Sequence, residues 1–236
     1  MTNKALTVPA VALGTWAWGD SEAGDGYFGS PLSESGLREV VEKARSNGLT
    51  LWDTAVAYGM GRSGTVLAQA LTGHHRSEYQ LSTKFTVEAV QNHYSLLHRS
   101  SERGGILDHC REHDVQFFSC MVLEQGALTG RYTPANPLPE GSNRAAVYNG
   151  ILPQLQSLTD RMGAIGKDRG ASAADVAAAS ASAKGTTPII GVTKAVHIDG
   201  VVRARGIALA DEEIAELEAL ADAADIDTRD WWEHEM

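Results

Sequence analysis

The sequence predicts an α/β fold in which parallel strands alternate with helices, and two observations support this class. First, short apolar runs typical of buried strands recur along the chain, at residues 11–16, 49–54, 79–85, 88–96, 115–122 and 187–193. Second, stretches with apolar residues at helical spacing lie between most of these runs. Because strands joined by helical crossovers are parallel, polar groups at their carboxyl ends would meet at one edge of the sheet.

The composition is that of an ordinary globular protein, and a length of 236 residues suits one large domain spanning residues 1–236. The formal net charge of −10 argues against a nucleic-acid-binding protein. No apolar run is long enough to cross a membrane, and the amino terminus, MTNKALTVPA, lacks the apolar core of a signal peptide. Cys110 and Cys120 suggest neither a disulfide nor a zinc site, and no metal is expected. We therefore expect a cytoplasmic protein that binds neither nucleic acid nor a membrane.

The first predicted strand and helix precede the most informative stretch. The run 11–16 predicts a short buried strand, and Ser33 offers an N-cap to a helix with apolar residues at helical spacing. Asn47 and Gly48 end this helix.

The stretch that follows carries an acid, a phenol and an amine. The strand at 49–54 contains Asp53 near its end, and a glycine-broken loop then presents Tyr58. A helix over 63–71 leads to the next strand, which carries Lys84. These three groups are predicted to meet where parallel strands end, which is where α/β barrels place their chemistry.

The remainder of the chain continues the alternation. Helices are predicted at 104–114, 151–169, 172–184, 195–204 and 211–224. Loops are predicted at 123–132 and, rich in Pro, Gly and Asn, at 133–149. The helix at 172–184 is so rich in alanine that it must pack closely against its neighbours.

About six core strands can be counted, whereas a complete barrel of this class has eight strands and ~250 residues. The deficit lies at Thr86 and Val87, which alone separate two predicted strands. Neighbouring parallel strands need a crossover of about a dozen residues, and Thr-Val is a poor hairpin turn. Residues 79–94 therefore either form one long strand or break the normal connectivity.

Several stretches, in order, resemble one known family over almost the whole chain. They are GTWAWGD, DTAVAYGMGRSGTVLAQAL, LSTKF, VQNHYSLL, SCMVLEQGALTGRY and TTPIIGVTKAVHIDGVVRA. The family is that of the aldo-keto reductases. The resemblance implies a TIM-barrel-derived (β/α) fold, here incomplete, with NADP (NADPH) as cofactor. It also implies the reduction of a small aldehyde or ketone by hydride transfer.

The resemblance assigns the acid–base chemistry to Asp53, Tyr58 and Lys84. The tyrosine would protonate the carbonyl oxygen, but free tyrosine has a pKa near ~10. A lysine ammonium beside the phenol lowers that pKa, and the aspartate holds the lysine in place. The structural alternative is an acid at a strand end, a loop tyrosine and a salt bridge at the edge of the core.

The same matches imply cofactor contacts at Gln91, Leu123, Gly126, Leu128, Gly191, Lys194 and His197, and substrate contacts at Trp16 and Trp18. Gln91 would hold the nicotinamide amide, and Lys194 would bind the 2′-phosphate where a helix begins. Gly126 and Leu128 would present backbone groups to the pyrophosphate. The structural alternatives are a satisfied core amide for Gln91, a simple turn for Gly126, and core side chains for Trp16 and Trp18.

The family pattern breaks just after Lys84. Placed on the family template, the chain lacks the segment from the third helix to the fifth helix, an internal deletion near residues 86–87. The family's catalytic His and a Ser–Asn pair that helps to hold the nicotinamide lie in that segment. His93, one residue past the matched Gln91 and Asn92, is a poor substitute for the missing His.

Three alternatives follow from this break. The protein is a catalytically impaired relative that acts as a binding or assembly module. Or it is a homodimer or higher homo-oligomer that exchanges residues 79–94 between subunits, so that exposed sheet edges are covered. Or the natural gene product is longer, and a segment is missing from this sequence.

Overall fold

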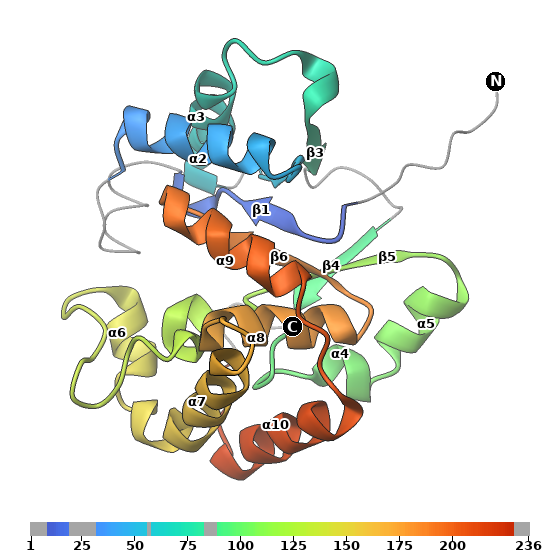
Figure 1. The fold of residues 1–236 in the computed structure, drawn as a ribbon, viewed down its shortest axis with the longest axis vertical. Helices are drawn as coiled ribbons and strands as arrows, with labels where there is room; N and C mark the ends of the chain where they lie inside the picture. Colours follow the sequence, from blue (N-terminus) through green and yellow to red (C-terminus); the bar gives the residue numbers. More distant parts are fainter. Residues whose placement is uncertain (1–8, 19–31, 56–57, 83–88, 229–236) are drawn as a thin grey trace.

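Six parallel strands form one curved sheet in the computed structural model, which describes residues 9–18, 32–55, 58–82 and 89–228 (Figure 1). The strands are β1 (Ala12–Gly14), β2 (Leu51–Asp53), β3 (Gln80–Ser82), β4 (Ala89–His93), β5 (Gln116–Cys120) and β6 (Thr187–Gly191). Their order is β3-β2-β1-β6-β5-β4, and every pairing is parallel. The sheet is a curled half-barrel, so the predicted incomplete six-stranded barrel is confirmed for the described part of the chain.

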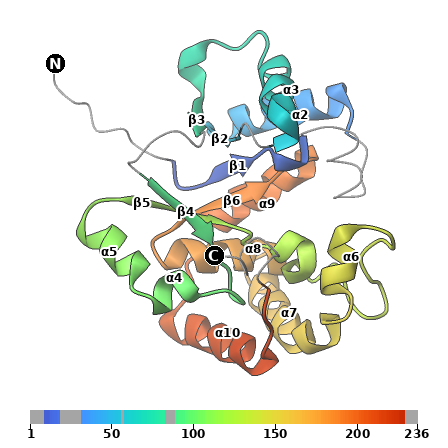
Figure 2. The same cartoon turned by 180° about the vertical axis from the view of Figure 1, so that it is seen from behind.

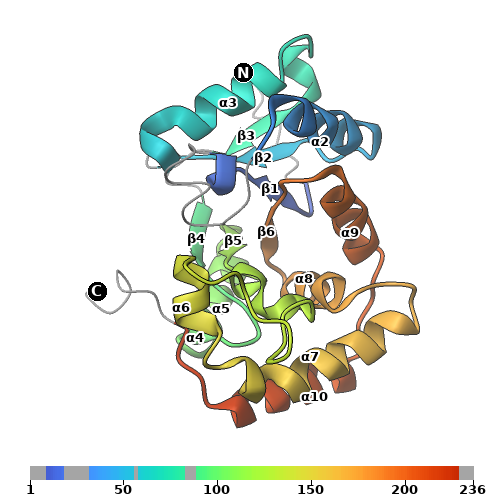
Figure 3. The same ribbon diagram turned by 90° about the vertical axis from the view of Figure 1, so that its left-hand side faces the viewer.

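Helices surround this sheet (Figures 2 and 3). The α-helices are α2 (Glu34–Ser46), α3 (Arg62–Ala70), α4 (Ser100–Arg103), α5 (Ile106–Glu112), α6 (Asn143–Tyr148), α7 (Leu152–Lys167), α8 (Ala173–Ala183), α9 (Ala195–Arg205) and α10 (Asp211–Ala224). Short 3-10 helices are η1 (Trp16–Trp18), η3 (Tyr58–Gly61), η4 (Arg76–Glu78) and η5 (Glu124–Thr129). Figure 3 shows α2 and α3 beside β1, β2 and β3, whereas α7 and α10 lie beyond α8.

Local sequence signals explain where the helices begin and end. The Ser33 hydroxyl accepts a hydrogen bond from the Gly36 N–H at 3.1 Å, which confirms the predicted N-cap of α2. Gly48, with φ 68°, follows the end of that helix. At α8, Ser172 and Asp175 form a reciprocal capping box.

The main core lies between the outer face of the sheet and its helices. Leu13 and Trp52 are neighbours in the register of β1 and β2, and both are buried in this core. The alanine-rich helix α8 contacts β6, α7 and α9, and most of its residues are buried, as its composition predicts. At Gly166 of α7, a Cβ atom would come within 2.7 Å of the Ala171 carbonyl oxygen, so the backbones approach too closely for a side chain.

The inner face of the half-barrel holds a much smaller apolar cluster, in which Ala12, Leu51 and Phe118 are buried. Toward the open edges the inner positions become polar. The register places the half-buried Gln80 beside Leu51 and the half-buried Gln91 beside Phe118. A complete barrel fills its interior with bulky branched side chains, whereas this lining suits a sheet whose interior is only partly covered.

The strands on either side of the predicted break lie at opposite edges of the sheet. β3 pairs with β2, and β4 pairs with β5. The six residues 83–88 that connect these strands, including Thr86 and Val87, fall outside the described residues. Of the two alternatives predicted for residues 79–94, one long strand is therefore wrong, because β3 and β4 are separate strands that are not neighbours in the sheet.

Two loop predictions are wrong in part. The segment 133–149 contains α6, which the Ser142 side chain caps by accepting from the Ala145 N–H at 3.2 Å. Tyr148 is buried and anchors that helix, so tertiary packing outweighs the Pro- and Gly-rich composition. Likewise the segment 123–132 contains η5. No helix among the described residues is long and apolar enough to cross a membrane.

Candidate active site

The first candidate residue, Asp53, ends β2 and is only 1% exposed. Its Oδ1 accepts a hydrogen bond from the Ser82 hydroxyl at 3.1 Å. Ser82 ends β3 and is opposite Asp53 in the register. The two side chains therefore point to the same side of the sheet, at the carboxyl ends of adjacent strands, where the sequence predicts the acid.

A buried group of hydroxyls fixes the backbone around Asp53. Thr15 Oγ1 lies 3.0 Å from the Asp53 carbonyl oxygen and 2.8 Å from Ser63 Oγ. The Ser63 hydroxyl also donates to the Thr15 carbonyl at 2.7 Å. These contacts connect the end of β1, the end of β2 and the start of α3, so both ends of the loop that carries Tyr58 are held.

Tyr58 begins η3, is half-buried and stacks on Trp16, with ring centroids 6.1 Å apart and planes at 25°. Trp18 is in a different environment. It is buried in the main core against Trp52, and its indole N–H donates to the Val192 carbonyl at 2.8 Å. Of the two predicted substrate contacts, Trp16 is therefore the one beside the phenol. Lys84 lies outside the described residues.

The second part of the site lies on β4 and the loop after β5. On β4, Asn92 donates to Ser101 of α4 at 3.1 Å, so Asn92 faces the helices and Gln91 and His93 face the interior. His93 is buried, and its Nε2 lies 2.9 Å from Oε1 of Glu124. Its ring also stacks on His98 at 4.1 Å. His93 is thus held by a buried carboxylate.

The loop after β5 has a rare backbone conformation. Glu124, Gln125 and Gly126 have φ values of 45°, 51° and 110°, all in the left-handed region that favours glycine. Each non-glycine residue in such a conformation costs on the order of 1 kcal/mol or more, and such strain clusters at functional sites. The N–H groups of Gly126 and Leu128 both donate to the Leu123 carbonyl, at 2.9 and 3.2 Å. In this structure they close turns within the loop.

Basic groups gather where β6 meets α9. Gly191 ends β6, and the exposed Lys194 is the N-cap residue of α9. His197 Nδ1 accepts from the Thr193 N–H at 3.1 Å. Burial lowers the pKa of His197, and the positive charges of Lys194 and Arg131 lower it further. The end of this strand is therefore electropositive.

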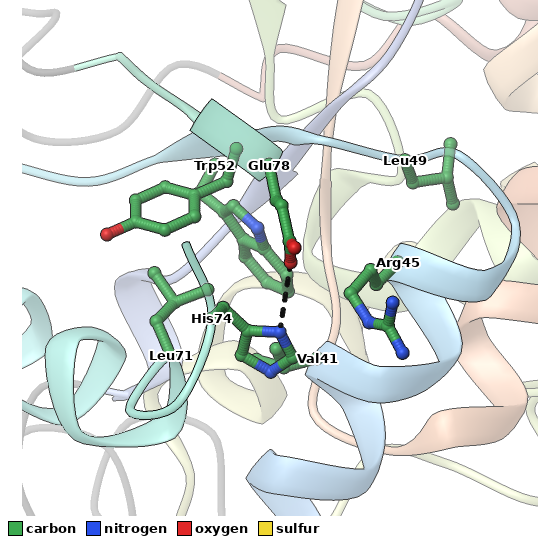
Figure 4. A pocket seen from close by; sticks show the side chains of 8 residues that line it. Val41, Arg45, Leu49, Trp52, Leu71, His74 and Glu78 are labelled. Atoms are coloured by element: carbon green, nitrogen blue, oxygen red, sulfur yellow. Dashed lines mark ion pairs between the residues drawn. The ribbon is translucent and has the colours of Figure 1, made fainter. Parts of the chain in front are cut away.

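A pocket at the opposite end of the strands is shown in Figure 4. It is lined by Val41, Arg45, Leu49, Trp52, Leu71, His74, Glu78 and Tyr79. His74 lies 3.2 Å from a Glu42 oxygen and 3.5 Å from a Glu78 oxygen. Leu49 and Tyr79 precede β2 and β3, so this pocket lies toward the amino ends of these strands, whereas Asp53 and Ser82 lie at their carboxyl ends.

Some of these residues escaped sequence reasoning. Ser82 could have been found, because strand alternation places residues 82 and 84 on one face. Glu124 and Arg131 lie in the motif SCMVLEQGALTGRY, in which the predicted cofactor contacts are Leu123, Gly126 and Leu128. Their partners are far away in the sequence, so no local pattern shows that Glu124 is buried or that Arg131 lies near His197.

The half-barrel of parallel strands, with polar groups at the carboxyl ends, defines a protein of the (β/α)-barrel class in a shortened form. The chain belongs to the Aldo/keto reductase family, whose sequence profile matches residues 10–90 and 86–222. The profile thus matches in two runs that meet at residues 86–90.

Curated relatives match part of their length. The chloroplastic pyridoxal reductase of Arabidopsis thaliana is 30% identical over 179 residues, which are 73% of this chain and 48% of that protein. An uncharacterised oxidoreductase of Mycobacterium tuberculosis is 39% identical over 77 residues, which are 33% of this chain and 23% of that protein. The chain therefore spans about half, or less, of the length of these relatives.

Solved structures share the fold. A glycerol dehydrogenase from Gluconobacter oxydans matches with a TM-score of 0.75 and 17% identity, covering 92% of this chain and 93% of the other. An aldo-keto reductase from Klebsiella pneumoniae in complex with NADPH matches with a TM-score of 0.64 and 17% identity, covering 91% of each chain.

Proposed function

We propose that this protein is an oxidoreductase that uses NADPH to reduce an aldehyde or ketone, with Tyr58 as the general acid. The observation that carries the proposal is the arrangement at the ends of β1, β2 and β3. There, a buried and hydrogen-bonded Asp53 ends β2, and the next element, η3, begins with Tyr58, which stacks on Trp16. The family's relatives that are named as reductases support the same chemistry.

When bound, NADPH would supply the hydride that is transferred to the carbonyl carbon. The chain's own residues supply the proton and the orientation. Tyr58 donates its hydroxyl proton to the carbonyl oxygen, and Lys84 stabilises the phenolate that results. The role assigned to Asp53, whose Oδ1 accepts from the Ser82 hydroxyl, is to orient the ammonium group of Lys84. We assign Trp16 to the substrate contact, and its stacking on Tyr58 limits the positions that the phenol ring can take.

The residues at the end of β6 suit a phosphorylated dinucleotide. Lys194 is the N-cap residue of the 11-residue helix α9, whose N-terminus favours an anion. The positive charges of Lys194 and Arg131 both act on His197. We assign the 2′-phosphate to Lys194, with Gly191 and His197 beside it. We assign the pyrophosphate to the loop that contains Leu123, Gly126 and Leu128, and the nicotinamide amide to Gln91.

The second candidate function is that of a catalytically impaired relative, which would bind a dinucleotide or a protein partner without turnover. The observation that favours it is the short connection between β3 and β4, which lie at opposite edges of the sheet. The family profile matches in two runs that meet at the same place. Both support an internal deletion near residues 86–87, which would remove the strand that carries the family's catalytic His.

Titration with NADPH separates these functions. The nicotinamide fluorescence of NADPH would be followed first, and then the loss of its absorbance with an excess of a simple aldehyde. Binding with turnover supports the reductase. Binding without turnover supports the impaired relative, and the absence of both contradicts a dinucleotide site. The intact mass of the protein, compared with its source gene, tests whether a segment is missing from this sequence.

A further inference from the structure

Glu124 is a completely buried carboxylate on which four side chains converge. Its Oε1 lies 2.9 Å from His93 Nε2 and also accepts from the Ser95 hydroxyl. The Thr228 hydroxyl reaches the same oxygen at 3.3 Å, and the Tyr148 hydroxyl donates to Oε2 at 2.9 Å. Three hydroxyl groups therefore donate to this carboxyl group, and a ring nitrogen of His93 faces it as well.

These four partners come from separate parts of the chain. His93 ends β4, Ser95 lies just beyond it, Tyr148 ends α6, and Thr228 follows α10. Glu124 itself begins η5 and the run of left-handed residues that continues to Gly126. One side chain therefore ties a strained backbone segment to a strand, to a helix and to the segment after the last described helix.

We propose that Glu124 is a positioning residue for the dinucleotide. Its carboxyl group holds the left-handed backbone of residues 124–126, in the loop to which the pyrophosphate is assigned, and acts on the cofactor only through that loop. This inference rests on the proposed function, which assigns the pyrophosphate to that loop. A left-handed conformation at a non-glycine residue persists only when its surroundings impose it. The four hydrogen bonds to the Glu124 side chain contribute to this here, together with the hydrogen bond that Arg144 donates to the Gln125 carbonyl at 2.9 Å.

Position 124 suits a glutamate, because its side chain presents two oxygen atoms to the surrounding partners. These partners approach both oxygens, and Oε1 alone has three of them. In Glu124→Gln the amide oxygen can still accept from Ser95, while the amide nitrogen replaces the acceptor that faces Tyr148. In Glu124→Ala all four side chains lose their partner. The two variants therefore form a graded series.

The experiment compares the dissociation constants of NADPH and of adenosine 2′-phosphate, which lacks the pyrophosphate and the nicotinamide. They are measured for the unmodified chain, Glu124→Gln, Glu124→Ala and the exposed control Glu140→Ala, with circular dichroism to confirm folding. We expect Glu124→Ala to bind NADPH at least about tenfold more weakly, the equivalent of ~1.4 kcal/mol. Glu124→Gln should lose less, and adenosine 2′-phosphate should bind all four proteins within about twofold.

Equal weakening for both ligands would show a general loss of structure and overturn the inference, as would NADPH binding that is unchanged in Glu124→Ala. If Glu124→Ala does not fold, Tyr148→Phe removes one donor and leaves the carboxylate in place. A selective loss of NADPH affinity in that variant supports the inference, and no loss overturns it. If the unmodified chain binds adenosine 2′-phosphate but not NADPH, or binds neither, the proposed function itself fails.

Discussion

The Ser82 hydroxyl donates to Oδ1 of Asp53 at 3.1 Å, across the register that pairs β3 with β2. This contact fixes the orientation of a buried carboxylate. We predict that Ser82→Ala lowers kcat for carbonyl reduction about ten- to a hundredfold, because a hydrogen bond to a charged group contributes roughly 1.5–3 kcal/mol. The dissociation constant of NADPH should stay within about twofold. Steady-state kinetics and a fluorescence titration check both values, and an unchanged kcat contradicts the role given to Ser82.

The phenol of Tyr58 is the proposed proton donor. Tyr58→Phe should lower kcat by about 10²-fold or more, as is typical for the loss of a general acid. NADPH binding should persist, because the phenol is assigned to the substrate and not to the dinucleotide. The matched control is Tyr79→Phe, whose ring contacts Arg76 beside η4. If Tyr58→Phe and Tyr79→Phe have the same kcat, another residue donates the proton.

The electropositive end of β6 can be tested through His197. Burial lowers its pKa, and the charges of Lys194 and Arg131 lower it further. Between this lowered pKa and the ordinary value of about 6.5, the unfolded chain binds a proton that the folded chain does not. This group therefore makes the free energy of unfolding fall as the pH falls through that window.

Lys194→Gln removes one positive charge beside His197, so it should raise the pKa of His197. Nuclear magnetic resonance titration of the histidine rings measures this change, with Lys167→Gln on α7 as the control. A pKa of His197 that does not change in Lys194→Gln would contradict the electrostatic contact.

A charged network attaches α10 to the rest of the fold. Lys184 Nζ lies 2.7 Å from a Glu102 oxygen and 2.6 Å from a Glu218 oxygen. We predict that Lys184→Met destabilises the protein by about 1–3 kcal/mol, because it leaves two carboxylates without their shared cation. Urea unfolding measures this change, and Lys167→Met should stay within about 0.5 kcal/mol. Equal midpoints for the two variants would contradict the prediction.

The same network has a pH dependence. Burial alone would raise the pKa of Glu102, but hydrogen bonds from Lys184 and Tyr94 outweigh it and lower the pKa. The resulting stability is present above the unfolded-state pKa of about 4.3 and is lost as the pH falls through the lower, folded-state pKa. In Lys184→Met, the free energy of unfolding should therefore depend less steeply on pH in this acidic range.

The two edge strands test whether chains exchange segments. The edge strands β3 and β4 are only three and five residues long. Short edges are one way in which proteins avoid pairing with copies of themselves. We predict a monomeric mass near 25.2 kDa by light scattering at micromolar concentration. A mass of twice that value would support the exchanged dimer instead.

The sequence predicts the strands well because buried strands need apolar runs, and all six runs contain strands. It does not predict which strands are neighbours. The placement of β3 and β4 at opposite edges depends on long-range pairing, which no local pattern encodes. The helix α6 was missed for a related reason, since the burial of Tyr148 stabilises a segment with the composition of a loop.

At the candidate site, the sequence identifies Asp53 and Tyr58, and the structure places them at the predicted ends of strands and loops. It does not separate Trp16 from Trp18, because burial decides which of them lies beside the phenol. Nor does it show the left-handed backbone at Glu124 and Gln125, since neither residue type favours that conformation.

The pairing of β1 with β6 has a consequence for biosynthesis. β1 and β6 are the first and last described strands in the chain, and their pairing alone joins β1–β3 to β4–β5 by way of β6. While residues 187–191 of the nascent chain are still inside the ribosome, strands β1–β3 and strands β4–β5 are two small sheets that no strand pairing joins. Contacts so distant in sequence form slowly, so we expect chaperones to meet this protein before its last strand arrives.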